Sequence, residues 1–195
     1  MIEVIGPGTP FAKETASLGL PQPSGSATRY YLDLERRLAG SRTAMGIMAL
    51  LERSSHNYYI LVCESTAMYL DHDHLKAAIN FDGGIAVISP DDEIQLGGGK
   101  KTYGEISLIH ELGHALQWQQ KPLWYRGHTR RANGALQGGG ASLDSAPDST
   151  DGSKYVVETH NVATHEWPVC DELGIEKRPD YCGAKIADYK AFWPT

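Results

Sequence analysis

The chain has 195 residues, of which 41% are hydrophobic, and carries a formal net charge of −6. This length and composition fit one globular domain with a sizeable core, and a negative charge without a large basic cluster disfavours nucleic-acid binding. The apolar runs are much shorter than the roughly 20 residues of a membrane span, and residues 1–10 lack the pattern of a classical export signal.

The first 27 residues are rich in glycine and proline, from Gly6-Pro7-Gly8 to Gly25. Such a density of residues that break helices and strands predicts a flexible linker over 1–27 that leads into a domain at 28–195. A frayed terminus is the alternative interpretation.

Two helices and two strands are predicted next. A helix over 29–38 is followed by a second helix, which Ser41 caps and which ends near residue 53. Runs of β-branched and aromatic residues predict strands at 58–63 and 85–88. We expect 85–88 to be the edge strand that pairs with an extended peptide substrate.

Two polar segments come before the central motif. Residues 71–74 (Asp-His-Asp-His) contain an H-x-H that can bind metal, but an acidic, solvated turn explains the composition better. Residues 97–101 are glycine-rich without the spacing of a phosphate-binding loop, so we predict an ordinary loop.

The motif His110-Glu111-Leu112-Gly113-His114 lies in an amphipathic pattern that predicts a helix over 104–120. Four residues make about 400° of helical rotation, so His110 and His114 project from one face and can bind one metal ion. Glu111 lies about 100° further round and can reach a water molecule at that ion. The motif therefore predicts two zinc ligands and a general base. A buried helix whose histidines bond to the backbone is the alternative.

Residues 121–153 contain many glycines, and we predict a long loop that acts as a mobile flap, with disorder as the alternative. An apolar rhythm then predicts a helix over 155–165.

The three cysteines, Cys63, Cys170 and Cys182, are too few and too irregularly spaced for a disulfide framework or a cysteine-ligated zinc site. Cys170 and Cys182 can pair in an oxidising compartment, and free thiols in a reducing one are equally open.

A catalytic zinc needs a third protein ligand. Gln117 and Gln120 stand where a metzincin would continue its motif, which excludes that class. The downstream candidates are His128, Glu158, His160 and His165. Glu158 fits best, because a glutamate on a following helix is the gluzincin arrangement.

His165 lies seven positions after Glu158, within about 20° of the same helical face. It can donate to the developing oxyanion as a catalytic residue, and a structural or surface histidine is the alternative. Asn161 can orient a ligand or bind substrate. Val162 replaces the aspartate of the usual gluzincin Glu-x-x-x-Asp, so the carboxylate that orients a zinc histidine must come from another segment.

Three blocks together resemble a known family: His110 to His114, Val157-Glu158-Thr159-His160-Asn161, and Cys170-Asp171-Glu172-Leu173-Gly174 with Arg178 and Tyr181. Their order and spacing resemble the zinc metallopeptidase domain at the C-terminus of VgrG-type spike proteins of type VI secretion systems, which is related to type III secretion effector proteases. The resemblance covers about residues 41–185. It implies His110, His114 and Glu158 as zinc ligands and Glu111 as the catalytic residue.

The resemblance also implies a toxin that is covalently carried by an upstream spike protein. A contractile secretion system would deliver it into another cell, with the periplasm of a bacterial competitor as the expected site and an immunity protein as a candidate partner. The linker-like start and the missing signal peptide agree with such delivery.

The expected fold is therefore α+β and zincin-like, with a small mixed or antiparallel sheet packed on the motif helix and a second ligand-bearing helix. The expected activity is hydrolysis of a peptide or protein substrate by a zinc-activated water, with Glu111 as general base. The alternatives are a zinc amidase that acts on cell-wall material and a non-catalytic binding module. Four protein ligands would normally close the structural zinc of such a module.

Overall fold

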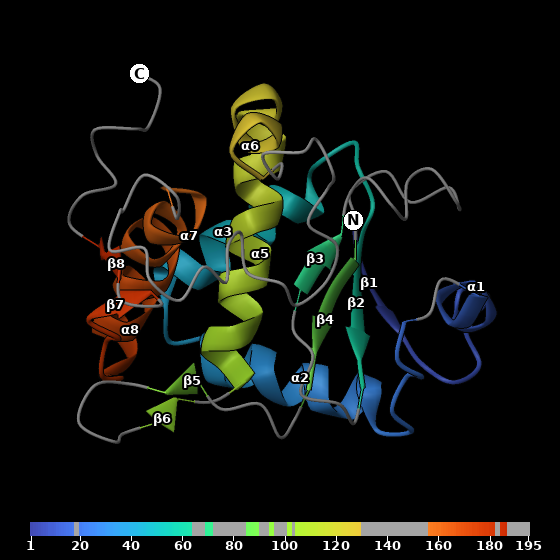
Figure 1. Cartoon of the computed structure of the whole chain (residues 1–195). Coiled ribbons are helices and arrows are strands. Elements are labelled where there is room, and N and C mark those ends of the chain that lie inside the picture. Colours follow the sequence, from blue (N-terminus) through green and yellow to red (C-terminus); the bar gives the residue numbers. More distant parts are fainter. Residues whose placement is uncertain are drawn as a thin grey trace.

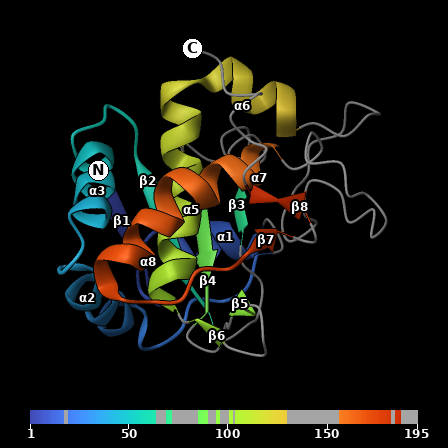
Figure 2. The same cartoon turned by 90° about the vertical axis from the view of Figure 1, so that its left-hand side faces the viewer.

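The computed structural model describes residues 1–17, 20–63, 69–71, 85–89, 94–95, 101–102, 104–129, 156–181 and 184–186. Helix α5 (Gly104–Gln120) runs between a sheet on one side and a group of C-terminal helices on the other (Figures 1 and 2). The other helical segments are α1 (Ala12–Ser17), α2 (Ala27–Leu38), α3 (Arg42–Glu52), α6 (Pro122–Thr129), α7 (Val156–Asn161), the π-helical η3 (Val162–Glu166) and α8 (Trp167–Leu173). The strands are β1 (Ile2–Ile5), β2 (Tyr58–Val62), β3 (Tyr69–Asp71), β4 (Ile85–Ile88), β5 (Ile94–Gln95), β6 (Lys101–Thr102), β7 (Asp180–Tyr181) and β8 (Ala184–Lys185).

The main sheet of the described residues has the strand order β1-β2-β4-β3. Strands β1, β2 and β4 are parallel, and β3 pairs with β4 in the antiparallel direction. A parallel pair needs a long crossover, and α2 and α3 lie in the sequence between β1 and β2. The molecule is thus α+β with a mixed sheet as expected, but its principal pairings are parallel rather than antiparallel.

Strand β4 forms at the predicted residues, but the prediction that it is an edge strand is wrong. It lies between β2 and β3, and all four of its residues are buried. Continuous burial is typical of an interior strand covered on both faces. The edge next to β4 is instead formed by β3.

Both faces of the sheet are covered, because successive side chains of a strand point to opposite faces. Tyr58, Ile60 and Val62 pack into the main core with residues of α2, α3 and α5. Tyr59 and Leu61 belong to a second cluster, against which Phe11, Ala12 and Leu20 pack. Figure 1 shows α1 on the far side of the sheet from α5.

The prediction of a flexible linker over 1–27 is wrong for two parts of this segment. Residues 2–5 form strand β1, and Phe11, Ala12 and Leu20 pack against one face of the sheet. Ile2 to Ile5 pair with β2 along their whole length, and the Phe11 ring lies 4.9 Å from the Tyr59 ring. Pro23 forms a bridge with Cys63. The glycines and prolines end short elements, as in the turn after β1 where Gly8 N donates to Gly6 O.

Three predicted helices are confirmed. Helix α5 has the predicted bounds, and α2 contains the predicted 29–38. Helix α3 begins after Ser41, whose hydroxyl accepts a hydrogen bond from the amide of Ala44 as an N-cap should. Its bounds therefore follow from local chemistry.

The predicted loop over 121–153 is wrong at its start, because Pro122–Thr129 forms α6. Proline is favoured in the first turn of a helix, where its missing N–H costs nothing. The remainder of that loop, and the predictions for 72–74 and 97–100, lie outside the described residues. Cys170 is a buried free cysteine, whereas Cys182 lies outside the described residues.

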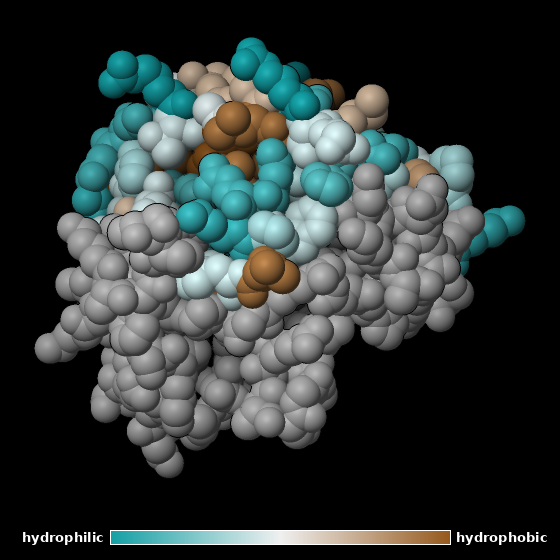
Figure 3. All heavy atoms as spheres, turned by 90° about the horizontal axis from the view of Figure 1, so that it is seen from above, coloured by the Kyte–Doolittle hydropathy of each residue, from teal (hydrophilic) through white to brown (hydrophobic). Residues whose placement is uncertain are grey.

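The exposed large hydrophobic residues of the described part are scattered over several elements. Seen from above, separate brown groups stand among teal ones (Figure 3). The exposed large hydrophobic residues of the described part are Met1, Leu32, Met45, Leu50 and Leu123. Among the described helices, none has the length and hydropathy to cross a membrane.

Candidate metal centre

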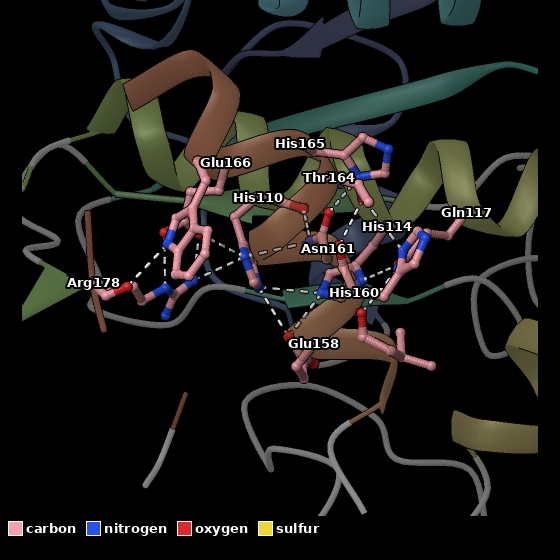
Figure 4. Close-up of polar contacts among 12 residues, drawn as sticks. His110, His114, Gln117, Glu158, His160, Asn161, Thr164, His165, Glu166 and Arg178 are labelled. Atoms are coloured by element: carbon pink, nitrogen blue, oxygen red, sulfur yellow. Dashed lines mark hydrogen bonds and ion pairs between the residues drawn. The ribbon is translucent and has the colours of Figure 1, made fainter. Parts of the chain in front are cut away.

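Three potential ligand atoms converge between α5 and α7. The Nε2 atoms of His110 and His114 are 3.2 Å apart, and each lies 3.1 Å from Oε2 of Glu158 (Figure 4). All three side chains are buried. The structure thus brings together two histidines one turn apart and the glutamate that we predict as the third ligand.

This triangle has the size that a metal ion requires. Ligand atoms about 2.0–2.1 Å from a tetrahedral zinc lie roughly 3.3 Å from one another, close to the spacings of 3.1 and 3.2 Å. Two neutral imidazoles and a carboxylate are also a common donor set for zinc in hydrolases. The three residues can therefore hold a metal ion.

The ring of His114 is oriented by Gln117. The amide nitrogen of Gln117 donates to the carbonyl oxygen of Val157 at 2.9 Å and to Nδ1 of His160 at 2.8 Å. Its oxygen therefore faces Nδ1 of His114 at 2.8 Å, and this ring nitrogen must donate. The lone pair of His114 is left on Nε2, which points into the triangle.

The ring of His110 is oriented in the same way by a carboxylate. Its Nδ1 lies 3.2 Å from Oε2 of Glu166, an atom that can only accept. Arg178 holds Glu166 with two hydrogen bonds, from Nε at 2.8 Å and from Nη2 at 2.5 Å. Asn161 donates to the backbone oxygen of His110 at 2.6 Å, which agrees with the expectation that it orients a ligand.

The π-helical segment η3 explains why Glu166 reaches His110. In an α-helix, residues seven positions apart share a face, which is the basis for the prediction that His165 accompanies Glu158. A π-helical turn adds about one residue to the count. Glu166, eight positions after Glu158, therefore takes the place beside the metal helix that regular spacing assigns to His165.

Glu111 is the one member of the motif with an unused buried oxygen. No described residue forms a hydrogen bond with its Oε2, although the side chain is buried. Burial raises the pKa of Glu111, which the charges of His110 and His114 only partly oppose. A buried carboxylate with a raised pKa beside the triangle can accept and return a proton.

The electrostatics of the triangle favour positive charge at its centre. Burial lowers the pKa of His110, but hydrogen bonds with Glu158 and Glu166 outweigh it and raise the value to about 9. Burial opposes the charge of Glu158 as well, yet the neighbouring histidines hold its pKa well below the usual range. A cation at this place therefore replaces a proton that the site already attracts.

His165 lies beside α5 rather than in the triangle. Its Nδ1 donates to Oδ1 of Asn161 at 2.8 Å. Both side chains pack close to Gly113, where an added Cβ would lie 2.0 Å from Oδ1 of Asn161. Burial lowers the pKa of His165 to about 4 and that of His160 to about 3, so both rings are neutral. His165 supports Asn161, and its catalytic role stays a prediction.

Sequence reasoning gave three residues no role in orienting the metal ligands: Gln117, Glu166 and Arg178. Gln117 was recognisable, because it lies three residues after His114 on the same helix and faces the same side. Glu166 was hidden by the π-helical turn, and Arg178 comes from a segment without regular structure. The side chain of His128 lies outside the described residues.

Comparisons of the chain with models of protein families, with characterised proteins and with solved structures found no match.

Proposed function

We propose that the chain is a zinc-dependent metallopeptidase with His110, His114 and Glu158 as zinc ligands and Glu111 as general base. The observation that carries this proposal is the unused, buried oxygen of Glu111, a carboxyl group that interacts electrostatically with all three converging ligands. A structural zinc is normally closed by four protein ligands. Among the described residues, three ligands and a neighbouring carboxylate meet here, which instead suits a site that keeps one position for substrate or water.

In the proposed reaction the metal ion, Glu111 and the residues that orient the histidines have separate roles. When bound, zinc would supply Lewis acidity, which lowers the pKa of a coordinated water to about 7 and stabilises charge on a carbonyl oxygen. Glu111 takes the proton from the attacking water and later gives it to the leaving amine, for which its raised pKa is suited. Gln117 and Glu166 keep the two imidazoles in the tautomer with Nε2 facing the site.

A zincin-like fold is part of the proposal. Helix α5 packs against the sheet, and the antiparallel strand β3 forms the sheet edge next to β4. An extended peptide can add to such an edge through main-chain hydrogen bonds. In this arrangement β3, and not β4, is the strand that receives the substrate.

The direct test is hydrolysis of denatured proteins by the wild type and by Glu111→Gln. The substitution keeps the size and polarity of the side chain but removes its ability to accept a proton. We expect the zinc content to stay unchanged and the rate of peptide hydrolysis to fall about 10²- to 10⁴-fold. Glu105→Gln, on the first turn of the same helix, is the control and should keep full activity.

Full activity of Glu111→Gln would contradict the mechanism. Cleavage of cell-wall material but not of denatured proteins by the wild type would instead identify the site as an amidase. Delivery as a toxin by a contractile secretion system, with a spike protein as carrier, stays a prediction from the sequence resemblance. Its test is growth of bacteria in which the domain is directed to the cytoplasm or to the periplasm.

A further inference from the structure

Arg178 reaches the metal centre from outside the two ligand-bearing helices. Its guanidinium forms a fork on Glu166, with Nε 2.8 Å from Oε1 and Nη2 2.5 Å from Oε2. The same Nη2 lies 2.9 Å from Nδ1 of His110, and because both nitrogens donate to Oε2 of Glu166, this is a contact between two donors that share one acceptor. Glu166 is fully buried and Arg178 is 9% exposed, so the contact is shielded from water.

The backbone of Arg178 is fixed as well. The indole nitrogen of Trp167 donates to the carbonyl oxygen of Arg178 at 2.9 Å. Glu166 and Trp167 are consecutive, so the junction of η3 and α8 holds this residue by its side chain and by its main chain. The chain can return to this junction because α8 ends at Gly174, whose φ of 68° is the left-handed conformation that glycine adopts readily.

We propose that Arg178 is a positioning residue of the metal centre, which acts through Glu166 on the ring of His110 and thereby links metal retention to the ordering of segment 175–181. The inference rests on the proposed metal site but not on its catalytic activity. The guanidinium fork holds both carboxylate oxygens of Glu166 and so fixes the direction from which Oε2 receives the N–H of His110.

Lysine cannot take this role, because its ammonium is a point charge without a planar fork. A group that merely neutralised Glu166 would be replaceable by lysine. Thermodynamic linkage has a second consequence. If the anchoring of segment 175–181 by Arg178 increases the zinc affinity by some factor, bound zinc must favour the anchored conformation of this segment by the same factor.

The test uses zinc affinity, measured by competition with a chromophoric chelator, for the wild type, for Arg178→Lys and for the double variant Glu166→Gln with Arg178→Gln. The double variant removes both charges together, so it leaves no unpaired buried charge. We expect both variants to bind zinc about 10- to 100-fold more weakly, the usual effect of losing a group that orients a metal ligand. Arg36→Gln is the control. It removes an arginine of α2 whose ion-pair partner is the exposed residue Asp33, and it should bind zinc like the wild type.

The second readout needs no variant. Amide hydrogen exchange in segment 175–181 of the wild type should be slower with zinc than without it, and Arg178→Lys should lose most of this difference. The inference is overturned if zinc leaves exchange in this segment unchanged, or if the folded variants bind zinc as tightly as the wild type. A wild type that binds no zinc would overturn the proposed function too, whereas equal binding by all four proteins would overturn only this inference.

Discussion

Gly113 is the position in the metal helix at which a side chain has no room. A Cβ there would lie 2.0 Å from Oδ1 of Asn161 and 2.8 Å from Nδ1 of His165. Asn161 also donates to the backbone of His110. The glycine between the two histidines of the motif therefore lets the helix that carries Glu158 approach closely.

Gly113→Ala should consequently destabilise the protein by about 1–3 kcal/mol, as overpacking does, and weaken zinc binding because Asn161 must move away from His110. Gly46→Ala is the matched control. It lies inside α3, with nothing within 4 Å of the added Cβ, and alanine should stabilise that helix by roughly 0.5–1 kcal/mol. Denaturant unfolding of both metal-free variants checks the pair. Stabilisation of both by the same amount would show that Gly113 has no packing role.

For single residues, the sequence predicted the metal ligands but not the residues that orient them. His110, His114 and Glu158 follow from motif spacing and from the class of site, because helical periodicity places ligands at fixed intervals. Arg178 contacts His110 across 68 positions of sequence, and no local pattern encodes such a contact.

Among the elements, α8 and α3 are joined by one carboxylate. Glu172 accepts hydrogen bonds from the hydroxyl of Ser41 at 2.5 Å and from the amide of Thr43 at 2.9 Å. These bonds hold the pKa of Glu172 below its usual value, with the bond from Ser41 as the largest cause. Two side chains thus accept hydrogen bonds from the first turn of α3: its N-cap Ser41 and Glu172 of α8.

Glu172→Gln should lower the melting temperature at pH 7, because the charged acceptor is lost. A carboxyl group whose pKa is lowered by folding stabilises the protein above its unfolded pKa of about 4.3 and loses this effect as pH falls through the folded value. The difference between wild type and variant should therefore shrink as the pH is lowered below about 5, when thermal unfolding is followed at each pH. Asp171→Asn, which affects only a surface ion pair, is the control and should change little. A difference that does not depend on pH would contradict this account of Glu172.

The same C-terminal helices show where sequence periodicity fails. The apolar pattern predicts a helix over 155–165, and α7 with η3 confirms its presence. The π-helical turn is not visible in that pattern, because one extra residue in a turn leaves the composition unchanged. The shift moves Glu166 instead of His165 to the neighbourhood of His110.

For the whole molecule, the order of the strands was the least predictable feature. Runs of apolar residues predict that 58–63 and 85–88 are strands, but the neighbours of a strand depend on chain crossovers far along the sequence. The short strands β1 and β3 were missed, and β3 is the neighbour that makes β4 an interior strand. Glycine and proline near β1 mark turns between elements of the domain, which composition alone does not distinguish from a linker.

The metal centre joins two layers of this molecule. His110 and His114 come from α5, which packs on the sheet, and Glu158 comes from α7, which belongs to the C-terminal helices. A bound ion would thus connect α5 with α7. Loss of Glu158 should remove the only ligand that the second layer supplies among the described residues.

The central claim is that these three side chains form one zinc site. The most direct measurement is the zinc content of the purified protein, determined by elemental mass spectrometry after equilibration with zinc and removal of the excess. We predict one zinc per chain for the wild type and for Glu111→Gln, and less than a tenth of that for Glu158→Ala. A wild type without zinc, or a Glu158→Ala variant that keeps one zinc per chain, would contradict the claim.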